Sequence, residues 1–127
     1  MSALTTTWVQ ICGVDDIAED TGVCALVGTY QVAVFRVSGV GELFALSNLD
    51  PFSETYVMSR GIVGSAGDIV KVSSPMYKHG FDLRTGKSLD DPSVCIPTFR
   101  VREESGRVFV AVPQSVCASV ERSEVDA

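Results

Sequence analysis

The chain has 127 residues, of which 46% are hydrophobic and 20% are charged, a balance typical of one globular domain. Its net charge of −6 argues against a nucleic-acid partner, because binding phosphates requires a basic surface. The first residues show no basic segment followed by an apolar run, and no stretch approaches the ~18 apolar residues of a membrane span. We therefore expect a cytoplasmic protein with no membrane contact.

Short β-rich segments separated by glycine, proline or asparagine recur along the chain, which is the pattern of an all-β domain. The sequence predicts strands at residues 8–12, 23–27, 31–37, 43–47, 69–73, 81–83, 99–102 and 108–112. One helical turn is predicted after the first strand, at residues 15–19.

Two hairpins follow from the alternation of apolar and polar residues. Their predicted turns, at residues 38–41 and 103–106, both contain glycine, which takes the positive φ that tight turns require. In the second hairpin the apolar side chains at positions 99 and 101 should share one face with the valines of the last strand, Val108, Val110 and Val112. Residues 1–113 are predicted to form the domain, and the polar, acidic residues 114–127 a flexible tail.

Four cysteines, Cys12, Cys24, Cys95 and Cys117, lie far apart and form no C-x-x-C pair. In a reducing compartment we expect them to be free thiols. A cluster held by these four cysteines is an alternative, and it would require all of them to converge in space.

The most specific pattern lies in two short segments. The first reads Asn48-Leu49-Asp50-Pro51-Phe52, and the second reads Ser74-Pro75-Met76-Tyr77 and continues to Phe81-Asp82-Leu83-Arg84-Thr85-Gly86. They resemble the two cluster-binding loops of Rieske domains, N-x-C-P-H and C-P-x-H-G-x-x-F-D-L-x-T-G. In this resemblance Asp50 and Ser74 occupy the cysteine positions, and Phe52 and Tyr77 occupy the histidine positions.

The resemblance implies the fold without its metal centre. A Rieske cluster needs two thiolates and two imidazoles, whereas this chain has a single histidine, His79. Lys78 replaces the family's usual glycine, and His79 stands one place too late to be a ligand. We therefore expect an all-β, Rieske-like antiparallel β-sandwich with the two former cluster loops at one tip, with no metal, cofactor or catalytic residue of its own.

Further segments narrow the resemblance. Similarity to the small-subunit family of cytoplasmic NAD(P)H-dependent nitrite reductases extends over residues 8–12, 21–26, 45–52, 59–61, 73–75 and 81–83. This resemblance implies a non-catalytic accessory subunit that binds a large subunit carrying sirohaem, a [4Fe-4S] cluster and FAD, which reduces nitrite to ammonium. The alternative is a free-standing small-ligand or regulatory binding module, which binds a small molecule between the loops with Asp50, Ser74 and His79 as polar anchors.

The former ligand positions also carry local expectations. Asp50 and Ser74 each precede a proline, so we expect turn residues that accept hydrogen bonds from nearby backbone N–H groups. Phe52 and Tyr77 are predicted to face each other and fill the space left by the cluster. The alternative is that Phe52 lies in the core while Tyr77 points to solvent. His79 is expected to be a surface imidazole.

Basic residues gather around the same loops of an otherwise acidic chain, namely Arg60, Lys71, Lys78, Arg84 and Lys87. They could steer an acidic partner, or they could form a solvated rim. Neighbouring Tyr56, Val57 and Met58 are expected to be exposed apolar residues. The predicted partner surface therefore consists of Tyr56, Met58, Arg60, Lys78, His79 and Arg84.

Overall fold

The computed structural model describes residues 6–38 and 42–112, and most of them lie in antiparallel β-strands. The elements in chain order are β1 (Thr7–Gly13), η2 (Val14–Asp16), β2 (Thr21–Val27), β3 (Tyr30–Val37), β4 (Glu42–Ser47), β5 (Leu49–Asp50), β6 (Thr55–Tyr56), η3 (Met58–Arg60), β7 (Ile62–Ala66), β8 (Ile69–Ser73), β9 (Gly80–Asp82), β10 (Thr98–Phe99), β11 (Val101–Glu104) and β12 (Arg107–Val112). The all-β prediction is confirmed.

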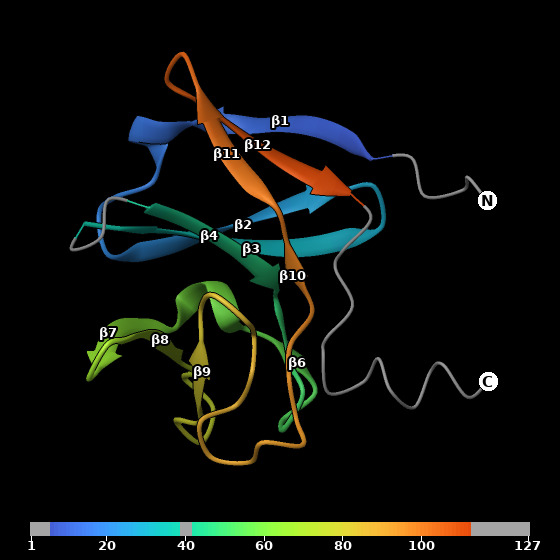
Figure 1. The fold of residues 1–127 in the computed structure, drawn as a ribbon. Helices are drawn as coiled ribbons and strands as arrows, with labels where there is room; N and C mark the ends of the chain where they lie inside the picture. The colour runs from blue at the N-terminus through green and yellow to red at the C-terminus, as the bar shows by residue number, and fades with distance from the viewer. Residues whose placement is uncertain (1–5, 39–41, 113–127) are drawn as a thin grey trace.

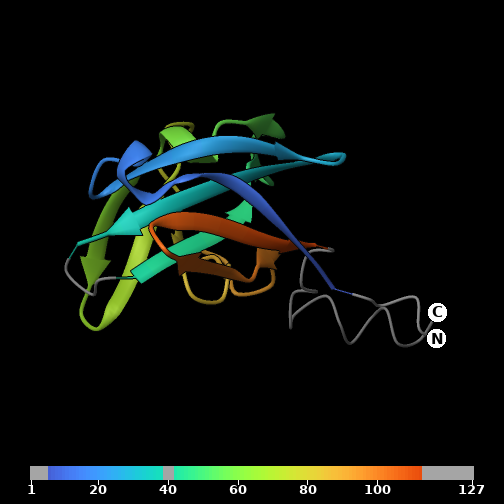
Figure 2. The same cartoon turned by 90° about the horizontal axis from the view of Figure 1, so that it is seen from above.

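The sandwich has three layers. A four-stranded sheet with the order β10-β4-β3-β2 lies in the middle, between the sheets β1-β12-β11 and β7-β8-β9 (Figure 1). Seen from above, the β7–β8 hairpin runs steeply across the direction of β3 and β4 (Figure 2). A short β5–β6 hairpin extends from the middle sheet toward the third layer.

Strand β3 shows why the middle sheet is buried on both faces. Its side chains alternate in direction, so Val32 and Val34 join the core beneath the β1-β12-β11 sheet. Phe35 and Ala33 point the other way, into a second core shared with the β7-β8-β9 sheet. A continuous apolar run suits a strand that packs on both sides.

The strand predicted at residues 99–102 is divided at Arg100. Phe99 pairs with Ala45 in the middle sheet, whereas Val101 pairs with Val110 in the outer sheet. The chain therefore passes from one layer to the next at this point. Both apolar residues still pack into the same core as the valines of β12, as their alternation predicts.

The turn predicted at residues 103–106 is confirmed. Ser105 and Gly106 both have positive φ and connect Glu104 to Arg107, as a two-residue hairpin turn requires. The other predicted turn falls partly on residues 39–41, outside the described part, and the register from Val37 to Glu42 brackets it. The expected helical turn is the 3₁₀ segment η2. The tail predicted at 114–127 also lies outside the described residues.

Cys12 and Cys24 are free thiols, and burial raises the pKa of both. Cys95 is disulfide-bonded, which corrects the expectation of a free thiol there. Cys117 lies outside the described residues. Within residues 6–38 and 42–112, no group of three or more His, Cys, Asp or Glu side chains could hold a metal ion. Over the same ranges, no helix has the length and apolar character needed to cross a membrane.

Candidate functional site

The two former cluster loops lie next to each other at the lower end of the molecule in Figure 1. The first loop (residues 49–56) is the β5–β6 hairpin, closed by a hydrogen bond from the Glu54 N–H to the Asp50 carbonyl at 2.7 Å. The second loop (residues 74–79) connects β8 to β9, and the Ser74 N–H donates to the His79 carbonyl at 2.9 Å. Both loops are therefore closed by their own backbone bonds.

The two residues at the cysteine positions bond directly to each other. The Ser74 hydroxyl donates to Oδ2 of Asp50 at 2.5 Å, and both side chains are buried. Oδ1 of Asp50 accepts the N–H of Phe52 at 2.8 Å, and the Ser74 oxygen accepts the N–H of Met76 at 3.1 Å. The local backbone bonds expected for these residues are confirmed. The bond between the loops was not predicted, and it occupies the place where a cluster would join them.

The residues at the four ligand positions do not fit a [2Fe-2S] cluster. The phenyl ring of Phe52 has no donor atom for iron, and Tyr77 is 71% exposed. The oxygens of Asp50 and Ser74 already satisfy each other and the loop backbone. A Rieske centre requires thiolate and imidazole ligands at these places.

His79, and not Tyr77, packs against Phe52. The two rings are stacked, with centroids 4.0 Å apart and an interplanar angle of 27°. Phe52 also packs against the core beside Phe81, at a centroid distance of 5.9 Å. The prediction that Phe52 and Tyr77 face each other is therefore wrong, and the alternative, with Phe52 packed against the core and Tyr77 pointing to solvent, is confirmed. The expectation that His79 is a simple surface residue is corrected as well, because its side chain is only 31% exposed.

The backbone of the second loop explains why His79, and not Tyr77, packs against Phe52. Tyr77 and Lys78 both lie in the left-handed region, with φ of 63° and 60°. Glycine is the residue best suited to that region, which accounts for the family's glycine at position 78. Two consecutive left-handed residues turn the Tyr77 ring outward and bring His79 back over Phe52.

Asn48 anchors the first loop and was missed as a structural residue by the sequence analysis. Its buried Oδ1 accepts the N–H of Ser59 at 2.7 Å, and its carbonyl accepts the N–H of Met58 at 3.0 Å. These bonds fold η3 against the loop and direct Met58 into the core, where it is fully buried. Met58 is therefore removed from the predicted partner surface. The signal available in the sequence was a polar residue following an apolar strand, which is also common in ordinary turns.

Carboxylates compensate part of the predicted basic surface. Arg84 pairs with Glu42 at 2.7 Å and lies over the Phe44 ring. Nδ1 of His79 lies 3.4 Å from Oδ2 of Asp90. The N–H of Gly80, together with His79, holds the pKa of Asp90 below its ordinary value. Tyr56, Arg60 and Lys78 are exposed, as the partner-surface prediction requires.

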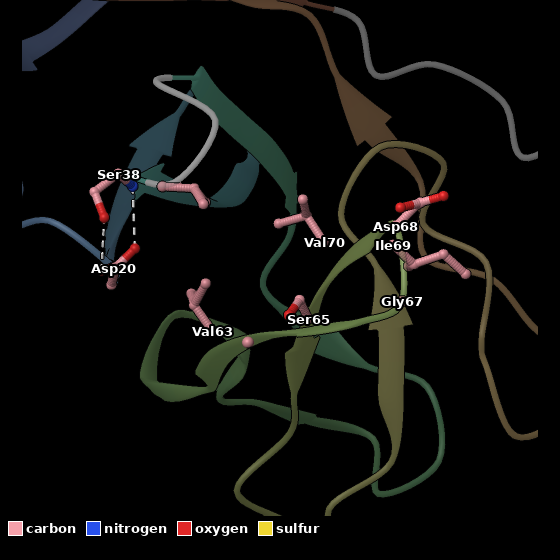
Figure 3. A pocket seen from close by; sticks show the side chains of 10 residues that line it. Asp20, Ser38, Val63, Ser65, Gly67, Asp68, Ile69 and Val70 are labelled. Carbon is pink, nitrogen blue, oxygen red and sulfur yellow. Dashed lines mark hydrogen bonds between the residues drawn. The ribbon is translucent and has the colours of Figure 1, made fainter.

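A surface groove of about 530 Å³ lies away from the two loops, between the middle sheet and the β7–β8 hairpin (Figure 3). Val63 and Val70 contribute apolar walls, and Asp20 fixes the rim by accepting hydrogen bonds from the N–H and hydroxyl of Ser38. None of the polar anchors proposed for a ligand between the loops lines this groove.

Replacing Phe52 with alanine should destabilise the domain far more than replacing Tyr77. Phe52→Ala removes the His79 stack and a contact with the core, and we expect a loss of about 2 kcal/mol, below the value for a fully buried aromatic residue. Tyr77→Ala removes an exposed ring and should change stability by less than about 0.5 kcal/mol. Urea unfolding measures both values, and equal losses would contradict the assigned packing.

Comparison with known proteins agrees with this geometry. The family model of the Rieske-like [2Fe-2S] domain matches residues 7–111, so the chain is a Rieske-like domain. The Escherichia coli (strain K12) NADH nitrite reductase small subunit is 41% identical over 101 residues, covering 80% of this chain and 94% of that protein. Within the Rieske-like domains, the chain belongs to the nitrite reductase small-subunit family.

Two further relatives bear on structure and context. One similar solved structure is the crystal structure of a Mycobacterium tuberculosis protein assigned as an NADH-dependent nitrite reductase small subunit. It gives a TM-score of 0.82 at 40% identity, covering 86% of this chain and 97% of that one. The Klebsiella oxytoca NAD(P)H nitrite reductase large subunit contains a segment 38% identical over 107 residues. That match covers 84% of this chain and 11% of that protein.

Proposed function

We propose that this protein is a non-catalytic accessory subunit of an NAD(P)H-dependent nitrite reductase and that it acts by binding the large catalytic subunit. The observation that carries the proposal is the similarity to a small subunit over 94% of that protein's length. A related segment also occurs inside a nitrite reductase large subunit, where the two parts share one polypeptide. A domain found both as a separate subunit and as a segment of its partner is well explained by stable association.

The geometry of the loops supports a contact role. Asp50 and Ser74 bond to each other, and Asp50 also bonds to the loop backbone. Neither Phe52 nor the exposed Tyr77 supplies the thiolate or imidazole that an electron-carrying cluster would need. Electrons for the reduction of nitrite to ammonium would then pass only through the sirohaem, [4Fe-4S] and FAD groups of the large subunit. We place the complex in the cytoplasm, where NAD(P)H is available.

Part of the predicted partner surface remains a candidate contact surface for the large subunit. Tyr56 is 56% exposed. Arg60, four residues further along the chain, and Lys78, on the second loop, are exposed as well. His79 and Arg84 contribute less free charge, because each faces a carboxylate.

Co-expression with the large subunit tests the proposal. We expect the two chains to co-elute in size-exclusion chromatography, and we expect nitrite-dependent oxidation of NAD(P)H to fall when this chain is omitted. The purified chain alone should contain no stoichiometric iron or acid-labile sulfide. If the chains elute separately and turnover is unchanged by the omission, the protein is not an accessory subunit.

A further inference from the structure

The outer face of the β1-β12-β11 sheet carries an unusual combination of side chains for an acidic protein. Side chains alternate along strands, so the residues that do not enter the core share the opposite face. This arginine face comprises Trp8, Gln10, Arg100, Arg102, Glu104, Arg107 and Phe109. It contains three arginines and one carboxylate in a chain whose net charge is −6.

Aromatic rings hold two of these arginines in place. Cζ of Arg102 lies 4.3 Å from the centroid of the Trp8 ring and 5.8 Å from that of Phe109. Cζ of Arg100 lies 5.5 Å from the same Trp8 centroid, and its Nη2 donates to the Thr6 hydroxyl at 2.9 Å. Stacking orders a guanidinium without neutralising its charge, so both groups can still bind carboxylates through their edges.

The positive charge on this face is less compensated than the charge of the predicted partner surface. There, Arg84 has Glu42 at 2.7 Å and His79 has Asp90 at 3.4 Å. On the arginine face, Arg102 has only a long 3.8 Å contact to Glu104. Arg100 makes no ion pair with any described residue. Ordered arginines beside a tryptophan are the composition of binding hot spots, and their uncompensated charge selects an acidic partner.

We propose that the arginine face binds an acidic segment of the large subunit, with the edges of Arg100 and Arg102 accommodating carboxylates and Trp8 covered by the same segment. This inference rests on the proposed function and specifies its contact surface. Because oppositely charged surfaces drive the association, binding should weaken as salt increases.

The test measures the dissociation constant for purified large-subunit holoenzyme by isothermal titration calorimetry. The Arg100→Glu/Arg102→Glu variant should weaken binding by about tenfold or more. The matched control is Lys71→Glu/Lys87→Glu, which reverses the same number of charges outside both the arginine face and the predicted partner surface and should stay within about twofold. A thermal melt of each variant shows whether it is folded.

Two single variants keep the test independent of the Trp8 stack. Gln10→Glu adds one negative charge to the face with both arginines intact, and should weaken binding by about threefold or more. Glu104→Gln removes the nearest carboxylate from Arg102 and should tighten binding, a gain that a merely structural role would not produce.

The outcomes separate the two proposals. If wild-type protein binds the holoenzyme but all face variants bind like wild type, the arginine face is not the contact surface, while the proposed function stands. If Arg60→Glu/Lys78→Glu weakens binding while the face variants do not, the predicted partner surface is the contact surface instead. If wild-type protein does not bind at all, the proposed function fails.

Discussion

Replacing Ser74 with alanine should lower the free energy of unfolding by about 1–3 kcal/mol, because the variant leaves a buried oxygen of Asp50 without its donor. Asp50→Ala should cost about 2–4 kcal/mol, since it frees the Ser74 hydroxyl and the N–H of Phe52 together. Both values come from urea unfolding monitored by circular dichroism.

The control for this pair is Ser93→Ala. Ser93 also donates its hydroxyl to an aspartate, Oδ1 of Asp91 at 2.7 Å, but this pair is exposed to solvent. Water can replace the lost bond there, so the loss should be below about 0.5 kcal/mol. The double variant Asp50→Ala/Ser74→Ala should cost clearly less than the sum of the single losses, because both remove the same bond. Additive losses, or equal losses at Ser74 and Ser93, would show that the bond between the loops contributes nothing.

Gly86→Ala should have the largest effect of any single substitution considered for this domain, a loss of about 3–5 kcal/mol. Gly86 has a φ of 81°, where a side chain is strained, and an added Cβ would overlap the carbonyl oxygen of Ile96. The overlap also breaks the hydrogen bond from the Ile96 N–H to the Gly86 carbonyl, which is 2.7 Å long. Thermal unfolding should show a large fall in melting temperature.

The control for Gly86 is Gly106→Ala. Gly106 has a similar φ of 78°, but nothing lies within 4 Å of an added Cβ. This variant therefore pays only the backbone strain, about 1–2 kcal/mol. The difference between the two glycines isolates the steric overlap with Ile96. If both alanine variants unfold at the same temperature, Gly86 is not required for the close approach of the chain to Ile96.

The sequence predicts the long strands well because their burial leaves a clear pattern. Strand β3 is recognisable from its apolar run, and the β11–β12 hairpin from its turn residues. Strand β7 was missed because four of its five residues are exposed, so no alternation marks it. The two-residue strands β5 and β6 are too short to produce any period.

The candidate site was predictable in its positions and less so in its contacts. Two thiolates of a Rieske centre share one iron, which implies that positions 50 and 74 are adjacent, and the Asp50–Ser74 bond follows that rule. The equivalent argument for Phe52 and Tyr77 fails, because the left-handed backbone at Tyr77 and Lys78 brings His79 inward instead. Backbone conformation at non-glycine residues has no reliable signal in the sequence. The burial of Met58 likewise depends on bonds from Asn48 that span the loop.

The direct bond between Asp50 and Ser74 also affects how the protein matures. In a cluster-dependent domain, closing the tip awaits the delivery of iron and sulfide, and chelators can reverse it. Here both bonding side chains, Asp50 and Ser74, are part of the chain itself, so the two loops can join as soon as the strands pair. The subunit should therefore reach its final shape during iron starvation or exposure to oxygen, conditions that would leave a cluster-bearing relative incomplete.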